Sequence, residues 1–291
     1  MGMETPEFFD LTNEKEYERR VSIGQREMSK SRVVFCGLLR DKEDQISFVQ
    51  ERIGAISKYF KDYRILIVEN DSSDSTREKL LKWASEDPKM AVLGCGINQK
   101  NCTLKLPKTE GHSVDKTRIA KMAYLRNLYL RAIYEHYSNW NYMIVWDMDI
   151  LGSIYIDGIA NSFGYFGSKA FRADAICANG IYRWMFLPIY YDTYAHQDFG
   201  DHEFHISQKL FHDINKGLTI RYERGETPVR VRSCFGGFTI YRISSILKRR
   251  AVYGASDPKS DNIECEHVIL HKNLKYVFMN PSMLHLILKN E

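Results

Sequence analysis

YMIVWDMDI, residues 142–150, places five apolar or aromatic residues directly before two aspartates, Asp147 and Asp149. The apolar run predicts a buried strand that ends where the aspartates begin. Side chains alternate along an extended chain, so both carboxylates are expected on one side. Two carboxylates so placed can hold one hard cation, Mn²⁺ or Mg²⁺, which in turn binds diphosphate oxygens. Because such triplets are common in surface loops, the position after a strand is what favours this interpretation.

The sequence on the N-terminal side of this stretch alternates between strand and helix patterns. Strands are predicted at 32–39, 63–70 and 91–93, and helices are predicted to end near residues 60, 85 and 137. This alternation predicts an α/β, Rossmann-like fold with a mixed, mostly parallel sheet and helices on both faces.

Polar clusters follow three of the predicted strands, namely Arg40-Asp41, Glu69-Asn70-Asp71 and Asp147-Met148-Asp149. Ligands of parallel sheets bind at the carboxyl ends of strands, so these clusters are expected to share one crevice. Residues 72–74 are expected to cap a helix, which leaves Glu69, Asn70 and Asp71 as candidates for binding a ribose or a base edge. Helix capping alone is the alternative.

Composition and charge exclude several classes of protein. The chain has 291 residues and a formal net charge of +4, too small to predict nucleic-acid binding without a clustered basic face. No apolar run reaches the 18 or so residues of a membrane helix, so no membrane span is expected. The six cysteines form no CxxC pair and lie in apolar or strand-like contexts. They are expected to be buried free thiols, which predicts a reducing, cytoplasmic location.

Three segments, in this order, resemble the donor half of GT-A glycosyltransferases: Val33 to Arg40, VENDSSDST at 68–76 and VWDMDI at 145–150. More closely, the chain resembles soluble glycosyltransferases of large DNA viruses and the fungal capsule mannosyltransferase group. Supporting segments are RIAKMAYLRNLYL at 118–130, CFGGFTIYR at 234–242 and CEHVILHKNL at 265–274. The likeness covers roughly residues 31–285.

This resemblance implies a metal-dependent enzyme that transfers a sugar from a UDP- or GDP-sugar to a hydroxyl of a glycan or glycoprotein. Residues 1–30 would be a lead-in, 31–150 the nucleotide-sugar-binding half, and 151–291 the acceptor-binding and catalytic half of one GT-A domain. Implied donor contacts are Leu38, Arg40, Glu69, Asn70, Asp71, Arg118, Arg126, Asn127 and Asp147. For Arg118 and Arg126, a solvated helix face is the alternative.

Candidate catalytic residues lie in the second half. Glu266 occupies the position of an acidic pair in many inverting GT-A enzymes and is a candidate general base, although His267 replaces the second acid. His271, one helical turn beyond His267, is a candidate third metal ligand, with a structural histidine as the commoner alternative. Asp192 follows an aromatic stretch suited to stacking on a sugar, with the carboxylate placed for its hydroxyls.

Several alternatives stay open on sequence alone. A nucleotidyltransferase would make a nucleotide-sugar, but the Gly-rich phosphate loop typical of that class is missing after Val34. A non-catalytic glycan-binding domain is the second alternative. Gly236 and Gly237 predict either close approach of backbone to a ligand or a β-bulge. A loop within 95–116 or 193–205 is expected to close over the donor.

Overall fold

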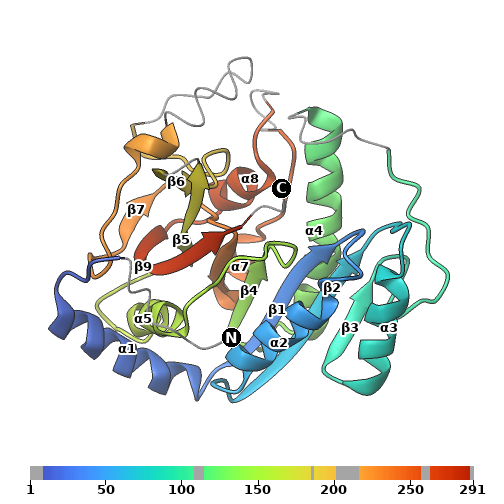
Figure 1. The fold of residues 1–291 in the computed structure, drawn as a ribbon, viewed down its shortest axis with the longest axis horizontal. Coiled ribbons are helices and arrows are strands. Elements are labelled where there is room, and N and C mark those ends of the chain that lie inside the picture. The colour runs from blue at the N-terminus through green and yellow to red at the C-terminus, as the bar shows by residue number, and fades with distance from the viewer. Residues whose placement is uncertain (1–8, 108–114, 185–186, 201–215, 257–262, 289–291) are drawn as a thin grey trace.

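The computed structural model describes residues 9–107, 115–184, 187–200, 216–256 and 263–288. In these ranges the chain forms one nine-stranded sheet with helices packed on both faces (Figure 1). The predicted α/β fold is therefore confirmed.

The first strands of the sheet follow the prediction closely. They are β1 (Arg32–Leu39), β2 (Asp62–Glu69), β3 (Met90–Leu93) and β4 (Tyr142–Trp146). They pair in parallel in the order β3-β2-β1-β4. Their carboxyl ends consequently meet at one edge of the sheet, as the sequence predicts.

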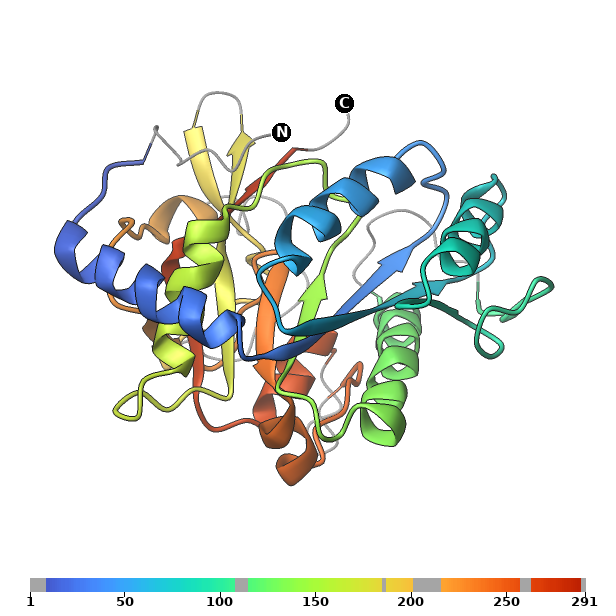
Figure 2. The same ribbon diagram turned by 90° about the horizontal axis from the view of Figure 1, so that it is seen from below.

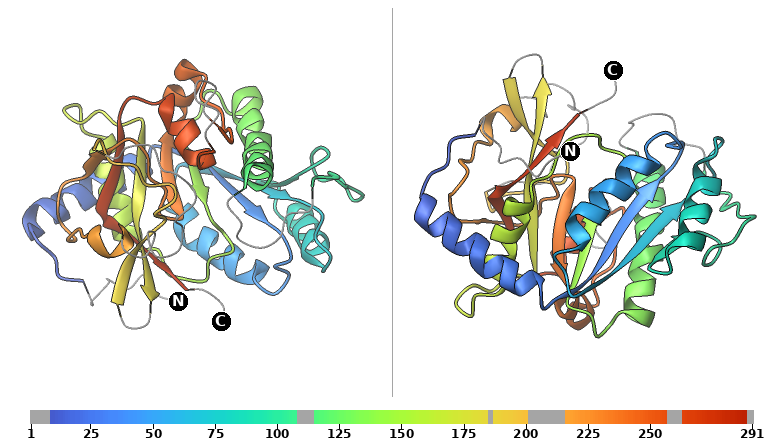
Figure 3. Two further views of the ribbon diagram at one scale, coloured as in Figure 1. Left: turned by 90° about the horizontal axis from the view of Figure 1, so that it is seen from above. Right: turned by 60° about the horizontal axis from the view of Figure 1, so that its bottom comes forward.

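The rest of the sheet mixes directions. It contains β5 (Ala175–Trp184), β6 (Leu187–Tyr191), β7 (Val229–Val231), β8 (Phe238–Arg242) and β9 (Val277–Ile287). The order continues from β4 as β8-β5-β9-β7, with β8 antiparallel to β4, and β6 forms a hairpin with β5 (Figure 3). The antiparallel β8 places its first residue, Phe238, beside Trp146 at the end of β4.

Helices cover the sheet through two separate core clusters. One face packs against α2 (Ile46–Ser57), α3 (Thr76–Glu86) and α5 (Ile156–Phe166). The other face packs against α4 (Lys116–His136), α7 (Ile243–Arg249) and α8 (Glu266–Lys272). Figure 2 shows the two layers on opposite sides of the strands. The alternation within β1 explains this, because Val33 and Phe35 face one layer and Val34 and Cys36 face the other.

The segment expected to be a lead-in contains a helix, α1 (Glu14–Met28), that packs along α5. The contact depends on glycine. A Cβ atom on Gly24 would lie 1.6 Å from the carbonyl oxygen of Ala160, and one on Gly164 would lie 2.1 Å from that of Arg20. The helix backbones therefore approach as closely as glycine permits, and α1 is part of the packed domain.

The prediction of six free thiols is wrong for four of them. Cys95 is bonded to Cys102, and Cys177 to Cys234. Cys36 and Cys265 are free and buried, as expected. The first disulfide closes a short loop after β3, and the second joins β5 to the segment before β8. Sequence spacing alone misses both pairs because neither forms a CxxC motif, although the Cα atoms lie only 5.5 and 5.9 Å apart.

No helix in the described part of the chain is long and apolar enough to cross a membrane. The cytoplasmic location stays a prediction.

Candidate active site

Asp147 and Asp149 follow the last residue of β4 at the carboxyl edge of the sheet. The backbone N–H of Asp147 donates to the carbonyl oxygen of Gly237 at 2.9 Å, which ties this turn to the start of β8. The side chain of Asp147 is 21% exposed, whereas Asp149 is exposed to solvent. One carboxylate is therefore held in the protein and the other projects from it.

Arg126 links this edge to the start of α8. From α4, its Nη2 lies 3.2 Å from Oδ1 of Asp147 and its Nε lies 2.9 Å from Oε1 of Glu266. The side chains of Arg126 and Glu266 are only 4% and 7% exposed. The guanidinium also lies over the ring of Phe235, at 5.2 Å from its centroid. One buried cation thus joins three separate parts of the chain.

The charges around Asp147 do not balance. Burial raises the pKa of its carboxyl to about 7; the Arg126 guanidinium lowers it, and the carboxylates of Asp149 and Asp192 raise it. The carboxylates of Asp149 and Asp192 therefore act on that of Asp147, and the guanidinium that pairs with Asp147 is shared with Glu266. A bound cation would stabilise the ionised form of this group.

The side chains at this site can hold a metal ion only if a bound molecule supplies further ligands. Within the described ranges, no group of three or more His, Cys, Asp or Glu side chains is arranged to hold a metal. Asp147 and Asp149 would supply two oxygen ligands, and diphosphate oxygens and water would complete the shell. Mg²⁺ is bound in this way in many phosphate-processing enzymes.

Asp192 reaches the same edge from β6, by a route that sequence pattern does not predict. It follows Tyr191, which pairs with Gly180 in β5, and its Oδ1 accepts a hydrogen bond from the backbone of Tyr194 at 3.0 Å. The side chain is partly exposed. The hairpin of β5 and β6 therefore brings a third carboxylate toward Asp147.

The two glycines before β8 make a turn that other residues would strain. Gly236 and Gly237 have φ angles of 62° and 73°. A Cβ atom on Gly236 would lie 2.1 Å from the carbonyl oxygen of Ala178, and one on Gly237 would lie 2.7 Å from Nδ1 of His285. The turn lets the carbonyl of Gly237 hold Asp147, so this pair of glycines shapes the site.

The carboxylates of the acidic cluster after β2 have hydrogen-bond or ion-pair partners within the protein. Glu69 is fully buried: Oε1 accepts from the backbone N–H of Ser72 at 2.8 Å, and Oε2 lies 2.6 Å from Nε of Arg77. Asp71 has a left-handed φ of 53° and accepts from the backbone N–H of Leu104 at 2.9 Å. These carboxylates hold the edge of the sheet in shape.

The remaining predicted donor residues lie around this edge. Arg40 is exposed, and its Nε lies 3.2 Å from Oδ2 of Asp41. Leu38 is partly buried and packs beside α4. Arg118 is partly exposed in the first turn of α4. Asn127 instead exchanges two hydrogen bonds with the backbone of Tyr253, at 3.0 and 3.1 Å. Asn127 therefore fixes the segment after α7 against α4.

His271 is 1% exposed, and both of its ring nitrogens lie near hydroxyl groups. Nδ1 is 2.9 Å from Oγ of Ser233 and Nε2 is 2.9 Å from the hydroxyl of Tyr241. Burial lowers the pKa of His271 to about 3, so the ring is neutral. To bind a metal ion, His271 would have to lose one of these two hydroxyl contacts. The role of His271 as a third metal ligand stays a prediction, and this geometry does not favour it.

Comparison with known families decides the class of protein. Residues 32–273 match the family model described as Cryptococcal mannosyltransferase 1. The chain belongs to this family. The expected likeness to the fungal capsule mannosyltransferase group is confirmed. No curated protein matches it in sequence.

Solved structures resemble this chain more distantly. The mannosyltransferase PcManGT from Pyrobaculum calidifontis, in complex with GDP-Man and Mn²⁺, is 11% identical with a TM-score of 0.48, over 94% of this chain and 65% of its own. S. aureus TarS 1-349 in complex with UDP-GlcNAc is also 11% identical with a TM-score of 0.48, over 89% and 59%. The chain thus spans about three fifths of the length of these structures.

Arg52 is a further residue at this site, and no sequence motif indicates it. Arg52 of α2 donates from Nη1 to the carbonyl oxygen of Ile150 at 2.6 Å, directly after Asp149. Its guanidinium lies 4.2 Å from the centroid of the Trp146 ring. Burial lowers the pKa of Arg52 to about 9, still high enough to keep it charged at neutral pH. Arg52 therefore fixes both ends of the turn that carries Asp147 and Asp149.

Proposed function

We propose that this chain is a metal-dependent GT-A enzyme that transfers a sugar from a UDP- or GDP-sugar to a hydroxyl of a glycan or glycoprotein. The observation that carries the proposal is the excess of carboxylate at the end of β4. There the carboxylates of Asp149 and Asp192 act on that of Asp147, which shares the guanidinium of Arg126 with Glu266. The family description makes a mannosyl donor the first to test.

Asp147 and Asp149 would hold Mn²⁺ or Mg²⁺ together with the diphosphate of the donor. When bound, the metal would offset the negative charge that develops on the departing nucleoside diphosphate. Arg126 keeps Asp147 oriented from behind through its Nη2, and Arg52 holds the following carbonyl of Ile150. The two arginines therefore fix the direction in which the pair of aspartates points.

Asp192 is our candidate for the base that takes the proton from the acceptor hydroxyl as the new glycosidic bond forms and the bond to the diphosphate breaks. It is partly exposed at the edge of the site. Glu266, the other candidate, is 5% exposed and accepts a charged hydrogen bond from Arg126. This oxygen is therefore already engaged, and the buried side chain is almost inaccessible to an acceptor hydroxyl. We therefore assign Glu266 the task of positioning Arg126.

The donor itself would lie between the ends of β1, β2 and β4. Leu38, Arg40, Asn70, Asp71 and Arg118 are the proposed contacts. Glu69 and Asn127 would shape the pocket through the internal hydrogen bonds described above. A loop over the donor stays a proposal for residues 95–116 and 193–205, parts of which lie outside the described residues.

The test is release of nucleoside diphosphate from a panel of donors, beginning with GDP-mannose and including UDP-sugars, in the presence of Mn²⁺. We expect the wild-type protein to release GDP or UDP and the Asp149→Ala variant to lose activity by about 100-fold or more, since a metal ligand is removed. Because Asp149 is exposed, the melting temperature of this variant should stay within a few degrees of wild type.

Glu135→Ala is the matched control, because Glu135 is an exposed carboxylate at the far end of α4. It should keep full activity. Equal activity of Asp149→Ala and wild type would refute the proposed metal site. Release of pyrophosphate in a separate assay with a nucleoside triphosphate and a sugar 1-phosphate would point instead to nucleotidyl transfer.

A further inference from the structure

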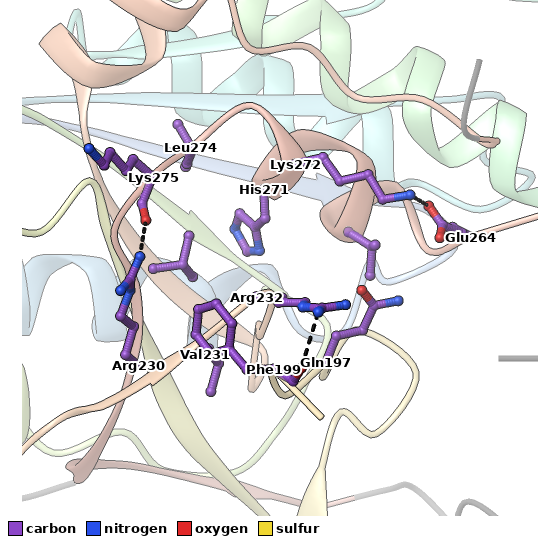
Figure 4. Close-up of a pocket in the computed structure, with 12 residues that line it drawn as sticks. Gln197, Phe199, Arg230, Val231, Arg232, Glu264, His271, Lys272, Leu274 and Lys275 are labelled. Carbon is purple, nitrogen blue, oxygen red and sulfur yellow. Dashed lines mark hydrogen bonds and ion pairs between the residues drawn. The ribbon is translucent and has the colours of Figure 1, made fainter. Parts of the chain in front are cut away.

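A second pocket, of about 330 Å³, lies between α8, β7 and the start of β9 (Figure 4). It is lined by Gln197, Phe199, Arg230, Val231, Arg232, Glu264, Val268, His271, Lys272, Leu274, Lys275 and Val277. None of these residues belongs to the carboxylate edge described above. The volume is that of a small-ligand site.

The lining of this pocket is positively charged. Arg230, Arg232, Lys272 and Lys275 carry four positive charges, and Glu264 carries the single negative charge of the lining, paired with Lys272. His271 contributes none, because burial keeps its ring neutral. The pocket consequently has the opposite charge to the site around Asp147. Cations gathered around a concave surface attract an anionic ligand.

Two of the cations are exposed side chains that are each oriented by a hydrogen bond to a backbone carbonyl. Nη2 of Arg230 donates to the carbonyl of Lys275 at 3.2 Å, and Nη2 of Arg232 donates to the carbonyl of Phe199 at 3.0 Å. Both guanidinium groups also lie near the ring of Phe199, at 5.1 and 5.8 Å from its centroid. A carbonyl contact orients the guanidinium of Arg230 without cancelling its charge.

The floor of the pocket suits a sugar ring. Val231, Val268, Leu274 and Val277 supply apolar surface, and Phe199 supplies an aromatic face. Gln197 adds an amide for hydroxyl groups. An apolar floor beneath a basic rim matches a molecule that has a ring face and one anionic substituent.

Helix α8 connects this pocket to the proposed active site. Glu266, its first residue, bonds Arg126 at the carboxylate edge, and His271, five positions later, lines the pocket. Five residues of α-helix span about 7.5 Å along the axis. Residues 266–271 of α8 are buried, so this length is the separation between the two places, and an oligosaccharide acceptor could span it.

We propose that this basic pocket binds an anionic group, a carboxylate or a phosphate, on the acceptor saccharide. That the ligand belongs to the acceptor rests on the proposed function, whereas the pocket and its charge do not depend on it. The anionic sugar would hold the acceptor on α8 while a hydroxyl elsewhere in the chain of sugars reaches Asp192.

The test measures binding of glucuronate, glucose 6-phosphate and glucose to the intact chain by calorimetry, at low and high salt. We expect the two anionic sugars to bind, more weakly at high salt, and neutral glucose to bind far less. The Arg230→Gln/Lys275→Gln variant should weaken anionic binding by at least about tenfold, since it removes charged hydrogen-bond donors. A preference for one anionic sugar tells a carboxylate ligand from a phosphate ligand.

The matched control is Lys248→Gln/Arg249→Gln, which removes two exposed cations from α7 and should leave binding unchanged. Binding of GDP or UDP with Mn²⁺ is measured in the same variants. It should be unaltered by the Arg230/Lys275 change, so failure of this inference stays separate from failure of the metal site. The inference is overturned if neither anionic sugar binds, if both double variants behave alike, or if the pocket variant loses nucleotide binding.

Discussion

The ends of β2 and β4 carry similar acidic sequences, but the carboxylates at the two ends differ in their hydrogen-bond and ion-pair partners. After β2, buried Glu69 has Arg77 and the N–H of Ser72 as partners, and Asp71 has the N–H of Leu104. After β4, Asp147 shares Arg126 with Glu266 and faces two further carboxylates, which leaves its pKa raised. Two clusters that look alike in sequence therefore differ in function.

The difference teaches how to separate a structural carboxylate from a ligand-binding one. A buried carboxylate with its own cation and N–H donors lowers the free energy of the folded chain by itself. A carboxylate crowded by others is costly until a cation arrives. The comparison predicts that a change at Glu69 acts on stability and that changes after β4 act on ligand binding, with Arg126 acting on both.

The largest effect is expected from Arg126→Met, which removes the one cation shared by Asp147 and Glu266. Leaving buried charge without its partner should lower the free energy of unfolding by about 3–5 kcal/mol. Transfer activity should also be lost, because Asp147 loses its orienting contact. Chemical denaturation and the donor-release assay measure the two effects. A variant as stable as wild type would show that Arg126 does not carry this network.

A smaller effect, on stability alone, is expected from Glu69→Gln. The substitution removes the charge that faces Arg77 at 2.6 Å and should lower the free energy of unfolding by about 2 kcal/mol. At a temperature where the variant is folded, the affinity for Mn²⁺ and nucleoside diphosphate should change little. Loss of that affinity without loss of stability would mean that Glu69 contacts the ligand, and the contrast between the two clusters would fail.

The first half of the fold and the central aspartates could be predicted because their signals are local. Strands β1 and β4 are continuous apolar runs that end in polar residues, and the period of side-chain burial follows directly from the sequence. Arg126 was expected only as a donor contact implied by the family resemblance, and its ion pairs with Asp147 and Glu266 were not predicted.

The second half was less predictable because its contacts join distant residues. Asp192 reaches the site only because β6 pairs with β5, and the disulfide of Cys177 and Cys234 spans 57 positions. The internal hydrogen bonds of His271 likewise depend on Ser233 and Tyr241, which no helical spacing relates to it. Arg52 gives no sequence signal at all, since it is simply one of the two charged residues on α2 and belongs to no motif.

The smallest effect is expected from Arg52→Lys, which tests whether the turn after β4 must be held rigidly. Lysine keeps the positive charge but loses the planar contact with Trp146 and the fixed hydrogen bond to the carbonyl of Ile150. We expect the free energy of unfolding to fall by about 1 kcal/mol or less, and the affinity for Mn²⁺ with nucleoside diphosphate to fall severalfold. Glu51→Gln, a change at the exposed neighbour on the same helix, is the control. Because Arg52 touches neither proposed metal ligand, weaker ligand binding with near-normal stability would show that the position of Asp149, and not charge alone, distinguishes the cluster after β4 from the one after β2.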